Sequence, residues 1–82
     1  MKKEQIRTLL KKKTNLNISE IAKSLDTKRE LLYQSIDGKG SRALRVAIAL
    51  KIGRKPSDIW SKNSQNVKVL DDHEYNKSMA NA

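Results

Sequence analysis

The sequence has no cysteine, no phenylalanine, one proline and three glycines in 82 residues. Without cysteine, neither a disulfide scaffold nor a thiolate metal site can form, and the chain suits a reducing cytoplasm. No apolar run approaches the ~20 residues needed to span a bilayer, and no signal-peptide core follows the basic N-terminus. With so few aromatic residues, the core of this one small domain must consist of leucine, isoleucine, valine and alanine.

Acidic residues are also scarce: nine stand against 18 lysines and arginines, which gives a net charge of +9. The excess is uneven, because residues 1–62 hold 16 basic and six acidic residues, and residues 63–82 hold two basic and three acidic ones. We expect residues 1–62 to fold and residues 63–82, which lack a sustained periodicity, to form a polar, flexible tail. The charge favours a polyanion partner such as nucleic acid over a membrane surface, because the apolar faces are needed for the core.

Two helix-start signals lie ten residues apart. Asn17 followed by Glu20 is a capping-box pattern, and Thr27 followed by Glu30 repeats it. The second helix can therefore begin two residues after Leu25, which leaves room only for a sharp corner between two short helices. The first of them has an apolar face at helical spacing, formed by Ile18, Ile21, Ala22 and Leu25.

The second helix, over residues 27–37, divides into two faces. Leu32 and Ile36 point to the core with Ser35 beside them. A helix-turn-helix DNA reader needs such a packed inner face, together with donors and acceptors for base edges on its outer face. The alternative is a helical hairpin in any small all-helical domain. We predict that the outer face reads bases through Lys28, Arg29, Glu30, Tyr33 and Gln34.

Individual residue types on this face suit particular partners. Arg29 is the best candidate for a bidentate guanine contact, and Gln34 for an adenine contact. Glu30 either caps its helix, accepts from a cytosine amine or rejects wrong bases by repulsion. Residues before and after the recognition helix are expected to bind phosphates and to fix its register on the duplex. These are Ser19, Lys23, Lys39, Ser41, Arg42 and Arg45.

Glycine and proline mark the remaining helices. Ser41 is a good N-cap for a helix over residues 42–52, which Gly53 would end. That helix is apolar on nearly every side, so we expect it to be central, and free N–H groups at its start favour a phosphate clamp. The G-K-G-S segment before it has neither the spacing of a P-loop nor a preceding strand, which argues against a nucleotide pocket.

Two further helices complete the expected fold. The first helix of the chain is predicted over residues 2–13. A short helix begins near Pro56, which suits a first-turn position, and Asp58 favours the same helix end. Ile59 and Trp60 would close the core, although an exposed stacking platform for single strands is the alternative for the tryptophan.

These features resemble a known family. Five short helices with a helix-turn-helix as the second and third resemble the lambda-repressor-like DNA-binding fold. Ala49-Leu50 followed by Pro56-Ser57-Asp58-Ile59-Trp60 resembles more narrowly the Ner-like branch, small phage and bacterial regulators with an A-L…P-x-x-I-W ending. Asp26 and Thr27 depart from the family's turn, where a glycine and then an apolar residue are usual, but aspartate tolerates a left-handed backbone better than most residues. The resemblance spans residues 17–61 and implies a DNA-binding regulator of early phage transcription.

We therefore predict an all-α, compact bundle of about five short helices that acts as a sequence-specific regulator of transcription on double-stranded DNA. Repression would be steric, because the bound protein occupies the promoter, either as a homodimer or as cooperatively binding monomers. The expected location is the nucleoid in the cytoplasm of a bacterial or phage-infected cell. Two alternatives stay open: a sequence-tolerant nucleic-acid binder, and an antitoxin-like protein-interaction module that also binds its own operator.

Catalysis finds little support in the sequence. The single histidine, His73, falls in the predicted tail without a plausible partner, and there is no cysteine nucleophile. The acidic run at residues 71–74 is expected to be solvated, because adjacent residues in a flexible segment seldom fix a coordination geometry. We therefore expect no enzyme activity, no cofactor, no metal and no small-molecule substrate.

Overall fold

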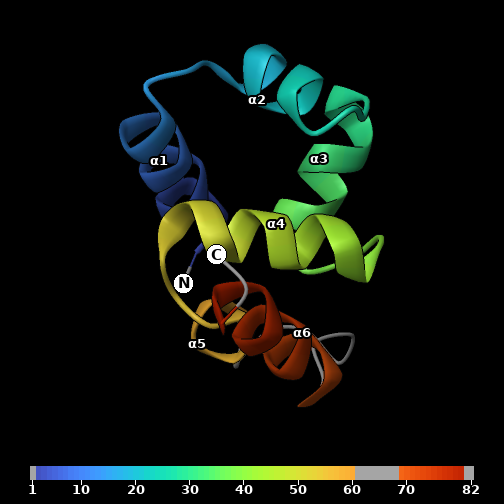
Figure 1. Ribbon diagram of the computed structural model, residues 1–82. Helices are drawn as coiled ribbons and strands as arrows, with labels where there is room; N and C mark the ends of the chain where they lie inside the picture. Colours follow the sequence, from blue (N-terminus) through green and yellow to red (C-terminus); the bar gives the residue numbers. More distant parts are fainter. Residues whose placement is uncertain (1, 61–68, 81–82) are drawn as a thin grey trace.

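The computed structural model describes residues 2–60 and 69–80, which form six α-helices (Figure 1). The all-α class and the compact bundle are confirmed, with one helix more than the sequence predicted. Every helix in the described ranges is too short or too polar to cross a bilayer. The helices are α1 (Lys3–Thr14), α2 (Ile18–Ser24), α3 (Arg29–Ile36), α4 (Arg42–Ile52), α5 (Pro56–Trp60) and α6 (Val69–Ala80).

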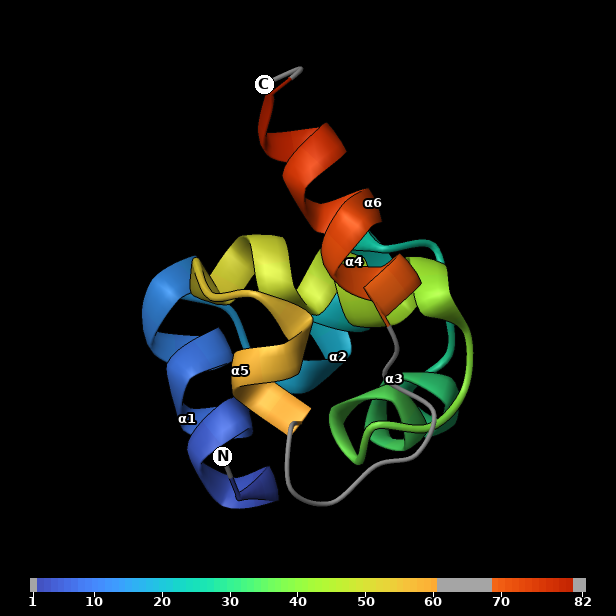
Figure 2. The ribbon, with the colours of Figure 1, turned by 90° about the horizontal axis from the view of Figure 1, so that it is seen from below.

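The central element is α4, against which α1, α3, α5 and α6 pack (Figures 1 and 2). Its ends are those predicted from the sequence. The Ser41 hydroxyl accepts a hydrogen bond from the Leu44 N–H at 3.2 Å, and Gly53 ends the helix in the left-handed conformation with φ 85°. Glycine is favoured there because it has no Cβ to oppose a positive φ.

The core is almost wholly aliphatic, as the composition requires. Trp60 is 3% exposed, and its indole Nε1 donates a hydrogen bond to the Ile36 carbonyl at 2.9 Å. The tryptophan is therefore a core residue that ties α5 to the end of α3, and the alternative of an exposed stacking platform is wrong. The aliphatic core residues are Ile6, Leu10, Ile18, Ile21, Ala22, Leu32, Ile36, Val46, Ile48, Ala49, Ile52 and Ile59.

The start of α2 confirms the first capping box. The Asn17 side-chain oxygen accepts from the Glu20 N–H at 2.9 Å, and the Glu20 carboxylate accepts from the Asn17 N–H at 3.2 Å. These reciprocal bonds satisfy two N–H groups that have no partner within a helix. The entry into α2 is therefore fixed by residues adjacent in sequence.

The turn between α2 and α3 differs from the prediction at one residue. Asp26 has φ 54°, the left-handed conformation expected for it. The Thr27 N–H donates to the Ala22 carbonyl at 2.9 Å and the Asp26 N–H to the Lys23 carbonyl at 3.1 Å, which is the Schellman pattern of a helix end. Thr27 therefore lies one residue before Lys28, which is the N-cap residue of α3. The predicted start at residue 27 is wrong: α3 begins at Arg29 and its N-cap residue makes no side-chain cap bond.

The predicted flexible tail contains a packed helix. Residues 69–80 form α6, which packs against α4 and α5, and Tyr75 is only 6% exposed. Asp71 is fully buried, and the Asp72 carboxylate accepts from the Ser57 N–H at the start of α5 at 2.9 Å. The prediction of a flexible, solvated segment is therefore wrong for residues 69–80. The rest of that segment, with the predicted boundary at 62–63, lies outside the described residues.

Candidate nucleic-acid interface

The faces of α3 divide as the sequence predicted. Leu32, Ser35 and Ile36 are at most 1% exposed, and the Ser35 hydroxyl donates to the Leu31 carbonyl at 3.0 Å. A polar residue can lie in this interface because its hydroxyl is satisfied within the helix. All five predicted base-reading residues are exposed on the remaining surface: Lys28, Arg29, Glu30, Tyr33 and Gln34.

Both ends of α3 are held firmly. The turn described above fixes its start, and the Trp60 indole bonds to the carbonyl of its last residue, Ile36. After the helix, the Lys39 N–H donates to the Gln34 carbonyl at 2.9 Å and the Gly38 N–H to the Ser35 carbonyl at 3.0 Å, with Gly38 at φ 82°. These contacts join both ends of α3 to the neighbouring elements.

One exposed apolar residue was not among the predicted contacts. Leu31 is 44% exposed and adjoins Glu30 on α3. Leu31 does not share the four-residue spacing of the buried Leu32 and Ile36. An apolar residue off that spacing is the sequence signal that could have identified it as an exposed contact. An exposed aliphatic side chain at this place suits contact with a thymine methyl group in a major groove.

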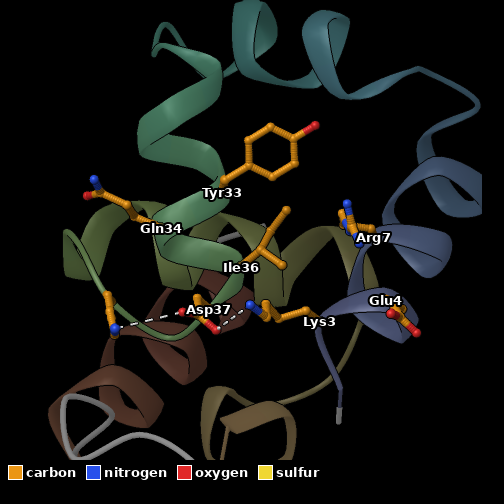
Figure 3. A pocket seen from close by; sticks show the side chains of 8 residues that line it. Lys3, Glu4, Arg7, Tyr33, Gln34, Ile36 and Asp37 are labelled. Carbon is orange, nitrogen blue, oxygen red and sulfur yellow. Dashed lines mark ion pairs between the residues drawn. The ribbon is translucent and has the colours of Figure 1, made fainter.

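A residue of α1 also reaches this surface. The guanidinium carbon of Arg7 lies 6.0 Å from the ring centroid of Tyr33, which is 43% exposed (Figure 3). A cation over a tyrosine ring is attracted by about 0.5–1 kcal/mol at an exposed site, so the pair favours one ring position. Sequence reasoning missed Arg7, because only the packing of α1 against α3 brings the two residues together.

The predicted phosphate contacts before α3 lie at the surface. Ser19 and Lys23 are both exposed, and their spacing places them on one side of α2. Lys23 and Lys28 line a shallow depression at the corner between α2 and α3, together with Asp26 and Thr27. Two cations therefore lie at the edge of α3 where that helix begins.

The predicted contacts after α3 are divided. Lys39 is exposed, with Nζ 3.9 Å from an Asp37 carboxylate oxygen. Ser41 is exposed, but its hydroxyl already caps α4. The Arg42 side chain is 47% exposed, and its Nε lies 3.2 Å from Asp71. Lys39 and Arg42 can therefore reach a phosphate, although Arg42 shares its charge with a carboxylate.

Arg45 is not a phosphate ligand, and this prediction is wrong. Arg45 is 5% exposed, and its Nε and Nη2 donate to the two Asp71 carboxylate oxygens at 2.6 and 3.3 Å. Its Nη1 donates to the Gly40 carbonyl at 2.8 Å. The guanidinium is committed to a buried carboxylate that α6 supplies, so it cannot bind an external anion without breaking the fold. The sequence offered no hint of this pairing, since it placed Asp71 in a solvated tail.

The acidic run in α6 has structural roles. Asp71 pairs with two arginines and Asp72 holds the start of α5, whereas His73 and Glu74 are exposed. In the described part of the chain, no group of three or more His, Cys, Asp or Glu side chains is placed to hold a metal ion. The exposed polar surface of α3 is therefore the strongest candidate for a binding site.

Comparison of the chain with protein-family models, with curated proteins and with solved structures gave no match.

Proposed function

We propose that the protein is a sequence-specific regulator of transcription that binds double-stranded DNA and reads the major groove with α3. The observation that carries this proposal is the division of α3, whose inner face is buried and whose outer face, together with the N-cap residue Lys28, exposes five long polar or charged side chains. The segment α2–turn–α3 acts in this proposal as a helix-turn-helix, in keeping with the resemblance to Ner-like regulators of the lambda-repressor-like type. The net charge of +9 supports a polyanion partner.

The proposed mechanism separates base readout from backbone contact. The major groove of B-DNA is wide enough for one α-helix, and its base edges present a distinct pattern for each base pair. Arg29 would bind a guanine and Gln34 an adenine, while Ser19 and Lys23 on one side and Lys39 and Arg42 on the other bind phosphates. Repression follows sterically when the protein occupies a promoter.

The composition of the outer face favours sequence-specific binding over general attraction to DNA. Glu30 and Leu31 lie on the exposed surface of α3. A carboxylate repels a polyanion and an aliphatic side chain adds no attraction, so a helix that bound only phosphates would gain from basic residues at these positions. Both residue types are useful where particular bases are accepted or rejected. A sequence-tolerant binder and an antitoxin-like interaction module are therefore the less favoured alternatives.

The test is selection of bound sequences from a random duplex library at physiological salt. We expect one motif to be enriched, because α3 offers a fixed set of donors and acceptors. A palindromic motif would indicate two recognition helices about one helical turn apart, and a single half-site would indicate a monomer. Recovery of unrelated sequences after repeated rounds would contradict the proposal.

A further inference from the structure

A groove lies between α1 and the second half of α3, next to the proposed recognition face (Figure 3). Its volume is about 620 Å³, and it is open to solvent. Lys3, Glu4 and Arg7 of α1 line one side, Tyr33, Gln34 and Ile36 of α3 line the other, and Asp37 and Lys39 follow at the end of α3. Because Tyr33 and Gln34 belong to both surfaces, the groove continues the proposed DNA-binding face onto α1.

Asp37 lies between two of the groove's lysines. Lys3 Nζ is 3.7 Å from one Asp37 carboxylate oxygen, and Lys39 Nζ is 3.9 Å from the other (Figure 3, dashed lines). Both distances exceed that of a charge-assisted hydrogen bond, and the lysine side chains are 65% and 68% exposed. Such pairs are weak in water, so both ammonium groups can transfer to a stronger anion.

Arg7 supplies the third cation. In the described part of the chain no carboxylate lies within ion-pair distance of its guanidinium, and its ring contact with Tyr33 leaves N–H donors for another acceptor. The guanidinium near the tyrosine ring still presents a planar set of donors, which suits a phosphate.

We propose that this groove binds the sugar-phosphate backbone of one DNA strand, with Lys3, Arg7 and Lys39 as its cationic contacts, while α3 lies in the adjacent major groove. This inference rests on the proposed function and extends the DNA-binding surface to α1. Phosphates border the major groove, and the groove adjoins the second half of α3, so in this proposal the strand that passes that end of the helix lies along these three side chains. Asp37 keeps the two lysines near the groove in the free protein and gives them up to phosphates on binding.

The test compares two double variants, each of which replaces one lysine and one arginine and so removes two positive charges. Lys3→Gln with Arg7→Gln alters the groove. Arg54→Gln with Lys55→Gln alters the connection between α4 and α5, which lies away from α3 in both views (Figures 1 and 2). Affinity for a random-sequence duplex is measured from about 50 to about 200 mM salt. Each phosphate contact contributes about 0.9 to the slope of the logarithm of affinity against the logarithm of salt concentration. We expect the wild type to lose about tenfold more affinity across this range than the groove variant does. The control should keep nearly the wild-type slope.

A third variant has the opposite expected sign. Asp37→Asn removes the carboxylate that competes with phosphate, so affinity for the same duplex should rise about two- to fivefold. Asp37 is the C-cap of α3, where loss of a negative charge does not weaken the helix. If the Lys3–Asp37 pair were merely structural, changing either partner would shift affinity in the same direction.

The possible failures can be told apart. If the wild type binds no duplex, the proposed function itself fails. If the wild type binds with a steep salt dependence but the groove and control variants have equal slopes, only the groove proposal is overturned. The groove proposal would also be overturned if the groove variant lost affinity for double-stranded RNA but kept the wild-type affinity and salt dependence for the DNA duplex. Thermal unfolding of each variant verifies that the fold is retained.

Discussion

At the scale of single residues, Asp71 is the clearest case of a side chain that holds the molecule together. Its carboxylate is buried and receives hydrogen bonds from both Arg42 and Arg45. Burying two charges costs several kcal/mol of desolvation, which the pairing and its hydrogen bonds offset. The pair is therefore sensitive to loss of either partner, because the other charge would then be buried alone.

Asp71→Ala should lower the free energy of unfolding by about 3–5 kcal/mol, because Arg45 would lose the carboxylate that compensates its buried charge. Glu74→Ala, an exposed change in the same helix, should stay within about 0.5 kcal/mol. Urea unfolding of the two variants measures this difference. Equal, small effects would show that α6 does not hold Arg45 as described.

Arg29→Ala should weaken binding to the selected operator by about 1–3 kcal/mol and binding to a scrambled duplex much less. The reason is that a guanine contact contributes only where the guanine is present. Arg54→Ala, the same change outside α3, should leave the ratio between the two duplexes unaltered. Equal losses on both duplexes in a titration would remove Arg29 from base readout.

At the scale of helices, local signals predicted those ends that are fixed by neighbouring residues. The cap at Asn17, the cap at Ser41 and the stop at Gly53 all involve partners within four residues. The start of α3 was misplaced because the spacing of Thr27 and Glu30 predicts a cap at Thr27, whereas the N-cap residue is Lys28. Thr27 instead closes the Schellman motif of α2 through its backbone N–H. The residue type does not reveal this, because any residue with a backbone N–H can make that bond.

The sequence did not predict α6, for a different reason. Tyr75 is its buried aromatic residue, and one such residue gives no hydrophobic periodicity. The other contacts that hold α6 to the fold are made by the carboxylates of Asp71 and Asp72. Acidic residues normally indicate a solvated surface, so their pairing with Arg45 and the Ser57 N–H becomes evident only in the folded molecule. For the same reason the assignment of Arg45 to phosphate was wrong, and the contact of Arg7 with Tyr33 was not foreseen.

The corner between α2 and α3 offers a test at this scale. Asp26 has φ 54°, which costs a β-branched residue roughly 1–2 kcal/mol. Asp26→Val should therefore lower the free energy of unfolding by about this amount. Asp26→Gly relieves the backbone and should be neutral within about 1 kcal/mol, since glycine adopts this region freely. Similar losses for both variants would show that the side chain, and not the backbone, determines the turn.

At the scale of the whole molecule, charge is distributed unevenly among the elements. Residues 2–60 carry 15 basic and six acidic residues, and α6 carries one basic and three acidic ones. In the proposed complex, the basic part contacts DNA through α1, α2, α3 and the loop that follows α3. The acidic helix α6 instead packs against α4 on the same side as α5 (Figure 1).

The central claim is that α3 distinguishes one DNA sequence from others. It is tested most directly by titrating the wild-type protein with the selected duplex and with a scrambled duplex of the same composition at physiological salt. We predict a preference of ~10³-fold or more for the selected sequence, the lower end of the range for specific DNA-binding proteins. Equal affinity for the two duplexes would contradict the claim and leave a basic helical domain that binds polyanions through charge alone.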